Sequence, residues 1–129
     1  MPAQNLTNFN LSLLKKTAVW DFATMGGTTT DTFPGFALPI GVTPLKAVVE
    51  IVTPPTSAAS TATIAIALTG TPGHTIKTAT VITDPFYAKK GKKVVALSAV
   101  ISGIETLNFA FAVQNVTAGK IKVTVYYTV

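Results

Sequence analysis

Alternation of apolar and polar side chains is the feature that most restricts the fold of this chain. Large apolar residues recur at every second position in five segments: 17–23, 45–53, 61–69, 105–113 and 119–129. Because successive side chains of a β-strand point to opposite faces, this period predicts strands with one buried face. Proline- and glycine-marked turns separate the segments, and no stretch predicts a helix of ten residues. The pattern therefore predicts an all-β domain, either a β-sandwich or a barrel.

The last segment, TAGKIKVTVYYTV, is the clearest of the five strands. One face of it carries large apolar side chains and the other carries lysine, threonine and tyrosine; the apolar set is Ile121, Val123, Val125 and Tyr127. We therefore expect the C-terminal end of the chain to be built into the fold.

Several other segments are less decisive. Residues 36–40 and 94–101 predict shorter strands, and residues 76–83 fit either a strand or a single helical turn. The prolines at 54–55 are expected to end the strand that begins at residue 45, because proline has no N–H to donate to a strand ladder.

The length of 129 residues is that of one domain. Residues 1–16 do not alternate, whereas alternation starts at residue 17. We expect an N-terminal arm at 1–16 followed by a single sandwich domain at 17–129.

The charge pattern restricts the partners. Ten basic and five acidic residues give a net charge of +5, and every basic residue is lysine. Proteins that read nucleic-acid sequence favour arginine, whose planar fork bonds guanine and phosphate. We expect attraction to an acidic surface and no nucleic-acid readout. With 48% hydrophobic and 12% charged residues, much of the surface is apolar or threonine-rich, which is typical of a surface covered by a partner or by other copies.

The sequence offers little for catalysis or metal binding. There is no cysteine, and the one histidine, His74, is expected to be an exposed turn residue in TPGHT. No serine lies in a nucleophile elbow, and the five acids are scattered: Asp21, Asp31, Glu50, Asp84 and Glu105. We expect no catalytic, cofactor or metal site, and no enzyme activity.

Targeting signals are also missing from the sequence. The first residues lack the basic start and apolar run of a signal peptide, and no run of about 18 apolar residues occurs. We expect synthesis in the cytoplasm and no membrane association.

The run KKGKK, which follows Phe86 and Tyr87, is the one concentrated charge feature. It has three interpretations: a nucleic-acid site with lysines for phosphates and aromatic rings for stacking, a solvated loop that prevents edge-to-edge aggregation, or a docking site for an acidic protein surface. Its candidate contacts are Lys89, Lys90, Lys92 and Lys93.

Two stretches, GVTPLKAVVEIVTPPTSAASTATIAIAL and NVTAGKIKVTVYYTV, resemble small structural proteins of tailed-phage virions, namely capsid decoration and head-fibre-like proteins. The resemblance implies a jelly-roll-like β-sandwich that assembles as a homotrimer. It also implies binding to the major capsid protein on the capsid exterior, and hence a location on the virion.

The N-terminal arm fits this expectation. It carries more apolar residues than a solvated tail needs: Leu6, Phe9, Leu11, Leu13 and Leu14. Each stabilises by about 1.5–3 kcal/mol when buried. We expect the arm to pack on a neighbouring copy or on the capsid; the alternative is an extra edge strand on its own sandwich.

Two functions of other classes stay open. A carbohydrate-binding or host-adhesion module would use aromatic side chains as a sugar platform, with Trp20, Phe86, Tyr87 and Tyr126 as candidates. An enzyme would need two of the five acids to meet in space as a carboxylate pair.

Overall fold

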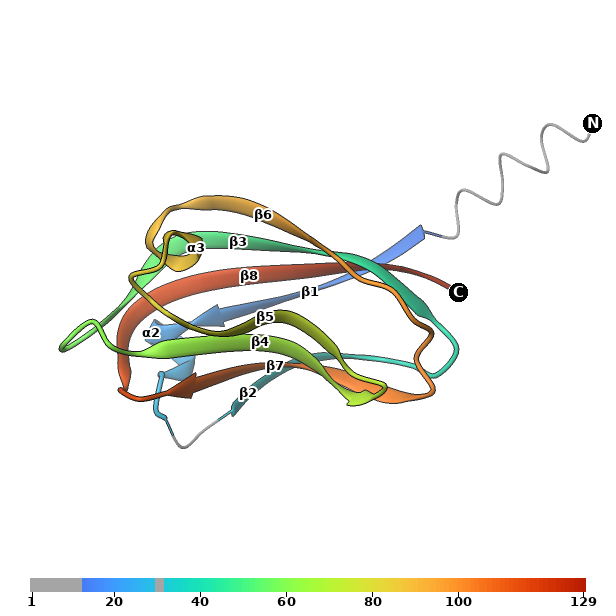
Figure 1. Cartoon of the computed structure of the whole chain (residues 1–129), viewed down its shortest axis with the longest axis horizontal. Helices are drawn as coiled ribbons and strands as arrows, with labels where there is room; N and C mark the ends of the chain where they lie inside the picture. Colours follow the sequence, from blue (N-terminus) through green and yellow to red (C-terminus); the bar gives the residue numbers. More distant parts are fainter. Residues whose placement is uncertain (1–12, 30–31) are drawn as a thin grey trace, which may run out of the picture.

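The protein, a computed structural model, is described for residues 13–29 and 32–129. Within these residues eight strands form two antiparallel four-stranded sheets that face each other (Figure 1). Sheet A has the order β1 (Leu13–Asp21), β8 (Val116–Thr128), β3 (Thr43–Ser57) and β6 (Gly91–Ala96). Sheet B has the order β2 (Thr32–Leu38), β7 (Gly103–Ala112), β4 (Thr63–Thr71) and β5 (His74–Val81).

The connections between strands identify the topology. Each strand passes to the opposite sheet, except that β4 and β5 form a hairpin within sheet B. Two four-stranded sheets connected in this way are a jelly roll, which contains two Greek keys. The prediction of an all-β, jelly-roll-like sandwich is confirmed.

The core lies between the sheets and is built from the apolar faces of the alternating segments. Val49, Ile51 and their neighbours on β8 meet the apolar face of sheet B. The side chains from both sheets are almost wholly buried: Trp20, Val49, Ile51, Ile121, Val123 and Val125 from sheet A, and Ile64, Ile66, Leu68, Leu107, Phe109 and Phe111 from sheet B.

The expected end of β3 at the proline pair is wrong, because the strand continues to Ser57. The pairing of β3 with β8 shifts register between Thr53 and Thr56, so Pro54 and Pro55 lie in an irregular stretch of the ladder. On the other side of β3, pairing with β6 reaches only Ile51. The prolines therefore interrupt no regular hydrogen bond, which is the setting that proline tolerates in a sheet.

Three weaker expectations are also resolved. The ambiguous residues 76–83 lie in β5 as far as Val81, followed by a turn. The strand expected at 36–40 is β2, and the one expected at 94–101 is β6, which begins at Gly91 and ends at Ala96. Part of the lysine run is therefore strand.

Two helices of four residues complete the described chain, α2 (Phe22–Met25) and α3 (Pro85–Ala88). Asp21 and Asp84 cap them, each accepting a backbone N–H at about 3 Å. Within residues 13–29 and 32–129, no helix is long and apolar enough to cross a membrane.

The N-terminal strand starts earlier than the expected domain boundary. β1 begins at Leu13, which pairs with Thr128 of β8, so the segment 13–16 belongs to the sandwich. Leu13 and Leu14 are exposed in β1. Leu6, Phe9 and Leu11 lie outside the described residues.

Candidate interaction surfaces

The outer faces of the two sheets differ sharply in charge. On the outer side of sheet A, four lysines, one from each strand, lie around Glu50: Lys15 on β1, Lys122 on β8, Lys46 on β3 and Lys92 on β6. A fifth, Lys120 of β8, lies farther along the strand opposite Asp21 of β1. They alternate with the buried residues of the same strands, so each side chain points away from the core. We call this surface the lysine face.

The strand register arranges the lysine face in rows. One row runs across three strands as Lys122, Glu50 and Lys92, and another runs as Lys15, Tyr126 and Lys46. The Lys46 ammonium lies 4.9 Å from the centre of the Tyr126 ring. Between the rows is an open hollow of about 190 Å³, lined by Lys15, Thr17, Val48, Glu50, Lys92, Lys122, Thr124 and Tyr126.

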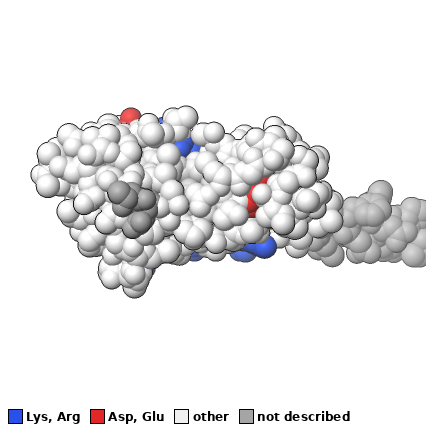
Figure 2. Space-filling model, turned by 90° about the horizontal axis from the view of Figure 1, so that it is seen from below, with Lys and Arg blue, Asp and Glu red and all other residues white. Residues whose placement is uncertain are grey.

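The outer side of sheet B carries small, uncharged side chains instead. Two cross-strand pairs from its centre are Ala65 with Ala110 and Thr69 with Thr106. The small or uncharged side chains on this side of β4 and β7 are Thr63, Ala65, Ala67, Thr69, Thr106, Asn108, Ala110 and Ala112, and the larger Ile104 lies near the start of β7. Figure 2, seen from the side of sheet B, shows a surface almost without coloured charged residues. We call this the neutral face.

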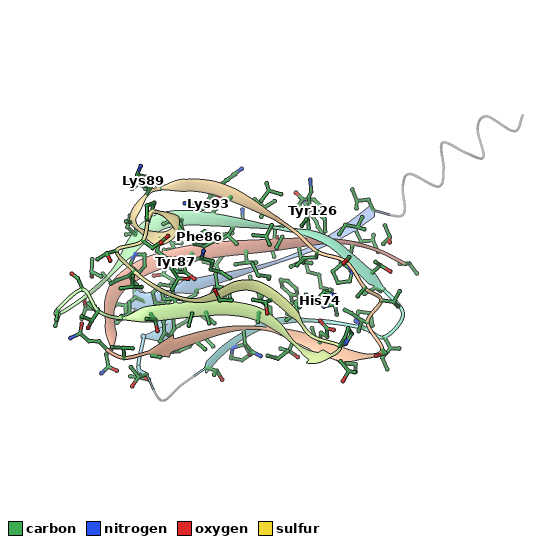
Figure 3. The ribbon with its side chains drawn as sticks, in the orientation of Figure 1. His74, Phe86, Tyr87, Lys89, Lys93 and Tyr126 are labelled. Carbon is green, nitrogen blue, oxygen red and sulfur yellow. The ribbon has the colours of Figure 1, made fainter. Side chains whose placement is uncertain are left out.

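The four lysines of the KKGKK run do not form one surface. Lys89 and Lys90 lie between α3 and β6, and Lys92 points into the hollow of the lysine face. Lys93 pairs with the buried Val49, so it points to the inner side of β6. Its ammonium donates to the Lys89 carbonyl at 3.2 Å and lies 5.4 Å from the centre of the Phe86 ring (Figure 3).

Both edges of sheet A carry an inward-pointing lysine. β6 has Lys93, and β1 has Lys16, whose ammonium donates to the Ala37 carbonyl of β2 at 2.8 Å. Inward charges on edge strands oppose pairing with a strand of another molecule. The protective interpretation of the run therefore fits Lys93, whereas Lys92 has the position of a partner contact.

The aromatic candidates for a sugar platform are dispersed. Trp20 and Tyr87 are fully buried, and the Tyr87 hydroxyl donates to the Ile64 carbonyl at 2.9 Å. Burial raises the pKa of Tyr87 well above its usual range, with the nearby Asp84 charge adding to the effect. Phe86 is half-buried at α3, whereas Tyr126 lies on the lysine face (Figure 3). These rings share no exposed surface.

The expectation that His74 is an exposed turn residue is wrong. His74 is only 8% exposed, and its Nδ1 lies 2.5 Å from Oε1 of the fully buried Glu105. The other carboxylate oxygen accepts the Gly73 N–H at 2.9 Å. The His74 Nε2 bonds the carbonyls of Ser98 and Ala99 in the connection between β6 and β7.

The sequence held a signal for this cluster. His74 is two residues from Ile76, and Glu105 is two residues from Leu107, so each shares the buried face of its strand. The sequence did not show that β5 and β7 both pair with β4. In this pairing, Leu68 of β4 lies opposite His74 on one side and opposite Leu107 on the other.

The chemistry of the cluster is structural. Among the described residues, the His74 Nε2 contacts only carbonyl oxygens, which accept but never donate, so this nitrogen carries a hydrogen. Burial alone would lower the pKa of His74, but the bonds to Glu105 and to the two carbonyls, with the Glu105 charge, raise it overall. A histidine whose Nε2 is engaged in this way has no free base for a nucleophile.

The other described acids have structural roles or stand alone. Asp21 and Asp84 cap helices, and Glu50 lies between two lysines on the lysine face. In the part of the chain that the structure describes, no three histidine, aspartate or glutamate side chains gather as a metal site. Asp31 lies outside that part.

Comparison with known proteins finds similarity in fold. No protein-family model and no curated protein sequence matches the chain. One similar solved structure is the acidic stable capsid of Helicobacter pylori bacteriophage KHP30, with TM-score 0.66 and 17% identity over 91% of this chain and 87% of that chain. Another is the cyanophage Pam1 capsid asymmetric unit, with TM-score 0.67 and 20% identity over 91% of this chain and 84% of that one. The chain thus has the fold of proteins found in phage capsids.

Proposed function

We propose that this chain is a structural protein of a phage virion that decorates the outside of the capsid as an oligomer, and that it is not an enzyme. The observation that carries the proposal is the jelly roll, which resembles chains of two phage capsid structures along nine-tenths of its length. The engagement of His74 and Glu105 in structural bonds supports a role without catalysis. The partner is then the major capsid protein.

The proposal is tested on virions purified from the source of the chain. Mass spectrometry should detect the chain in intact particles. Brief treatment of particles with a lysine-reactive reagent should modify its exposed lysines before those of interior proteins. Particles that lack the chain would refute the virion role, and lysines that react only after disruption would refute the exterior position.

We propose a homotrimer assembled through the neutral face. Copies with a net charge of +5 repel one another, and the repulsion is smallest where uncharged faces meet. Small side chains on β4 and β7 also permit close approach of a second backbone.

Sedimentation equilibrium at micromolar concentration is expected to give the mass of three chains of 13.4 kDa each. Ala65→Lys in the neutral face should dissociate this species, because it buries an unpaired charge in the interface. Val94→Lys, on the outer side of β6, is the control and should leave the mass unchanged. A native chain that stays monomeric throughout, on and off particles, refutes the trimer.

We also propose that the segment 1–12 contacts a neighbouring copy or the capsid. Deleting it is expected to leave the thermal unfolding temperature unchanged, since β1 begins at Leu13 and its pairing with β8 remains. Trimer formation or attachment to particles should weaken. Calorimetry measures the first effect, and sedimentation with stripped particles measures the second. A deletion that unfolds the domain, or that leaves assembly and attachment unchanged, contradicts the proposal.

A further inference from the structure

We propose that the lysine face of sheet A is a docking surface for another protein whose contact area is acidic but contains a basic side chain opposite Glu50. Where that partner is taken to be the capsid protein, the inference rests on the proposed function. It assigns the docking contact to residues from four strands, and of the KKGKK run only Lys92 belongs to it.

The charges of the lysine face have no polar partner among the residues that the structure describes. Lys15, Lys92 and Lys122 make no hydrogen bond or ion pair with any residue of 13–29 or 32–129. Of the described acids only Glu50 lines the hollow, so positive charge predominates among its lining residues. Exposed ammonium groups gathered around a hollow attract carboxylates, and the attraction both speeds encounter and orients the partner.

The spacing of the charges defines a pattern. Neighbouring strands lie about 4.8 Å apart, which places the backbones of Lys122 and Lys92 roughly 10 Å apart with Glu50 between them. Lys15 and Lys46 belong to the row that contains Tyr126. Tyr126 lies four residues from Lys122 along β8, so the two rows are about 13 Å apart at 3.3 Å per residue. The hollow between the rows offers Val48 and the Tyr126 ring for apolar contact.

Glu50 decides which class of partner fits. A nucleic acid or a sulfated polysaccharide presents negative charge along its whole length, so part of it would face the Glu50 carboxylate and be repelled. A protein surface is able to place a lysine or arginine opposite Glu50 and carboxylates opposite Lys92 and Lys122. The sequence of charges plus, minus, plus therefore favours a protein.

A second copy of the chain is a poor occupant of the same surface. Two lysine faces that meet would bring together the four lysines around each Glu50, which are eight ammonium groups against two carboxylates. Like charges in contact cost several kcal/mol. The lysine face and the neutral face are thus suited to different partners.

The first experiment compares two double variants that lose the same charge. Lys92→Gln with Lys122→Gln removes two ammonium groups from the hollow, and Lys89→Gln with Lys90→Gln removes two from the corner before β6. The probe is the virion stripped of this chain, and binding is measured by co-sedimentation at several salt concentrations. We expect about a ten-fold loss of affinity and a shallower salt dependence for the first pair only. Equal behaviour of the two pairs overturns the inference.

The second experiment uses the sign of the effect at Glu50. Glu50→Gln makes the face more positive, so it should strengthen binding to a uniform polyanion and weaken binding to a patterned protein surface. We expect weaker binding to stripped virions, but later elution from heparin-agarose. Stronger binding of Glu50→Gln to virions overturns the inference. A second overturning result is that the native chain is retained on heparin at physiological ionic strength and that Lys92→Gln with Lys122→Gln abolishes this retention.

The outcomes separate this inference from the proposed function. Absence of the chain from virions refutes the proposed function, while the heparin measurements still decide whether the lysine face binds a uniform polyanion. Presence on virions with no effect of the Lys92 and Lys122 changes refutes the inference alone. A changed trimer mass in that double variant assigns the face to a second copy and also overturns it.

Discussion

Replacement of His74 by alanine is expected to lower the free energy of unfolding by about 3–5 kcal/mol, the usual cost of removing one partner from a buried pair. Among residues 13–29 and 32–129, the change leaves the Gly73 N–H as the one partner of the fully buried Glu105 carboxylate, and it removes the donor to the Ser98 and Ala99 carbonyls. Urea unfolding followed by the fluorescence of Trp20, the single tryptophan, measures the loss.

The pH dependence gives this prediction a second test. The pKa of His74 is raised in the folded protein, so the histidine stabilises the fold most below its unfolded pKa of about 6.5. That contribution is lost as pH rises through the folded pKa. The difference in stability between the native chain and His74→Ala should therefore be larger at pH 5.5 than at pH 8.5.

Two controls keep the His74 prediction specific. His74→Gln retains an amide donor of similar reach and should lose less stability than His74→Ala, without the same pH dependence. Thr75→Ala changes the exposed neighbour and should be close to native. If the stability difference between the native chain and His74→Ala does not vary with pH, the raised pKa of His74 in the folded protein is contradicted. Near-native stability of His74→Ala would contradict its structural role.

Replacement of Trp20 by alanine is expected to lower the free energy of unfolding by about 3–5 kcal/mol, because it leaves a cavity in the core. Trp20 is fully buried, its indole N–H donates to the Gly26 carbonyl at 2.8 Å, and its ring centre lies 4.9 Å from that of Phe111. A Cβ added at Gly119 would lie 2.9 Å from the ring, so the backbone of β8 closes on this side chain.

Circular dichroism during urea unfolding measures this loss, since the variant has no tryptophan to report by fluorescence. Trp20→Phe keeps an aromatic ring at this place in the core and loses the hydrogen bond to the Gly26 carbonyl. It should therefore lose clearly less stability than Trp20→Ala. Native stability of Trp20→Ala would show that the side chain is not a central part of the core. Glycan binding that disappears in Trp20→Phe while the fold is retained would reopen the carbohydrate interpretation.

Local alternation was enough to predict the class of fold. The apolar sides of 45–53, 61–69, 105–113 and 119–129 are the buried sides in the structure, because side chains alternate between the two faces along a strand. The exceptions lie at the ends of these segments, where Leu45, Val113 and Val129 are exposed. By the same rule, Lys46 and Glu50 alternate with Ala47, Val49 and Ile51 and lie on the outer face of β3. Arm contacts by Leu6, Phe9 and Leu11 stay a prediction.

The arrangement of the strands was decided by tertiary structure. β1 lies beside β8, β8 beside β3 and β3 beside β6, so Lys15, Lys122 and Lys92 share one face although they are far apart in the sequence. In sheet B, the pairing of β5 and β7 with β4 brings His74 to Glu105, so a residue that looks like part of an exposed turn is buried in an ion pair. Period two records which side of a strand is buried but not which strand lies next to it, because pairing depends on how whole sheets close around a shared core.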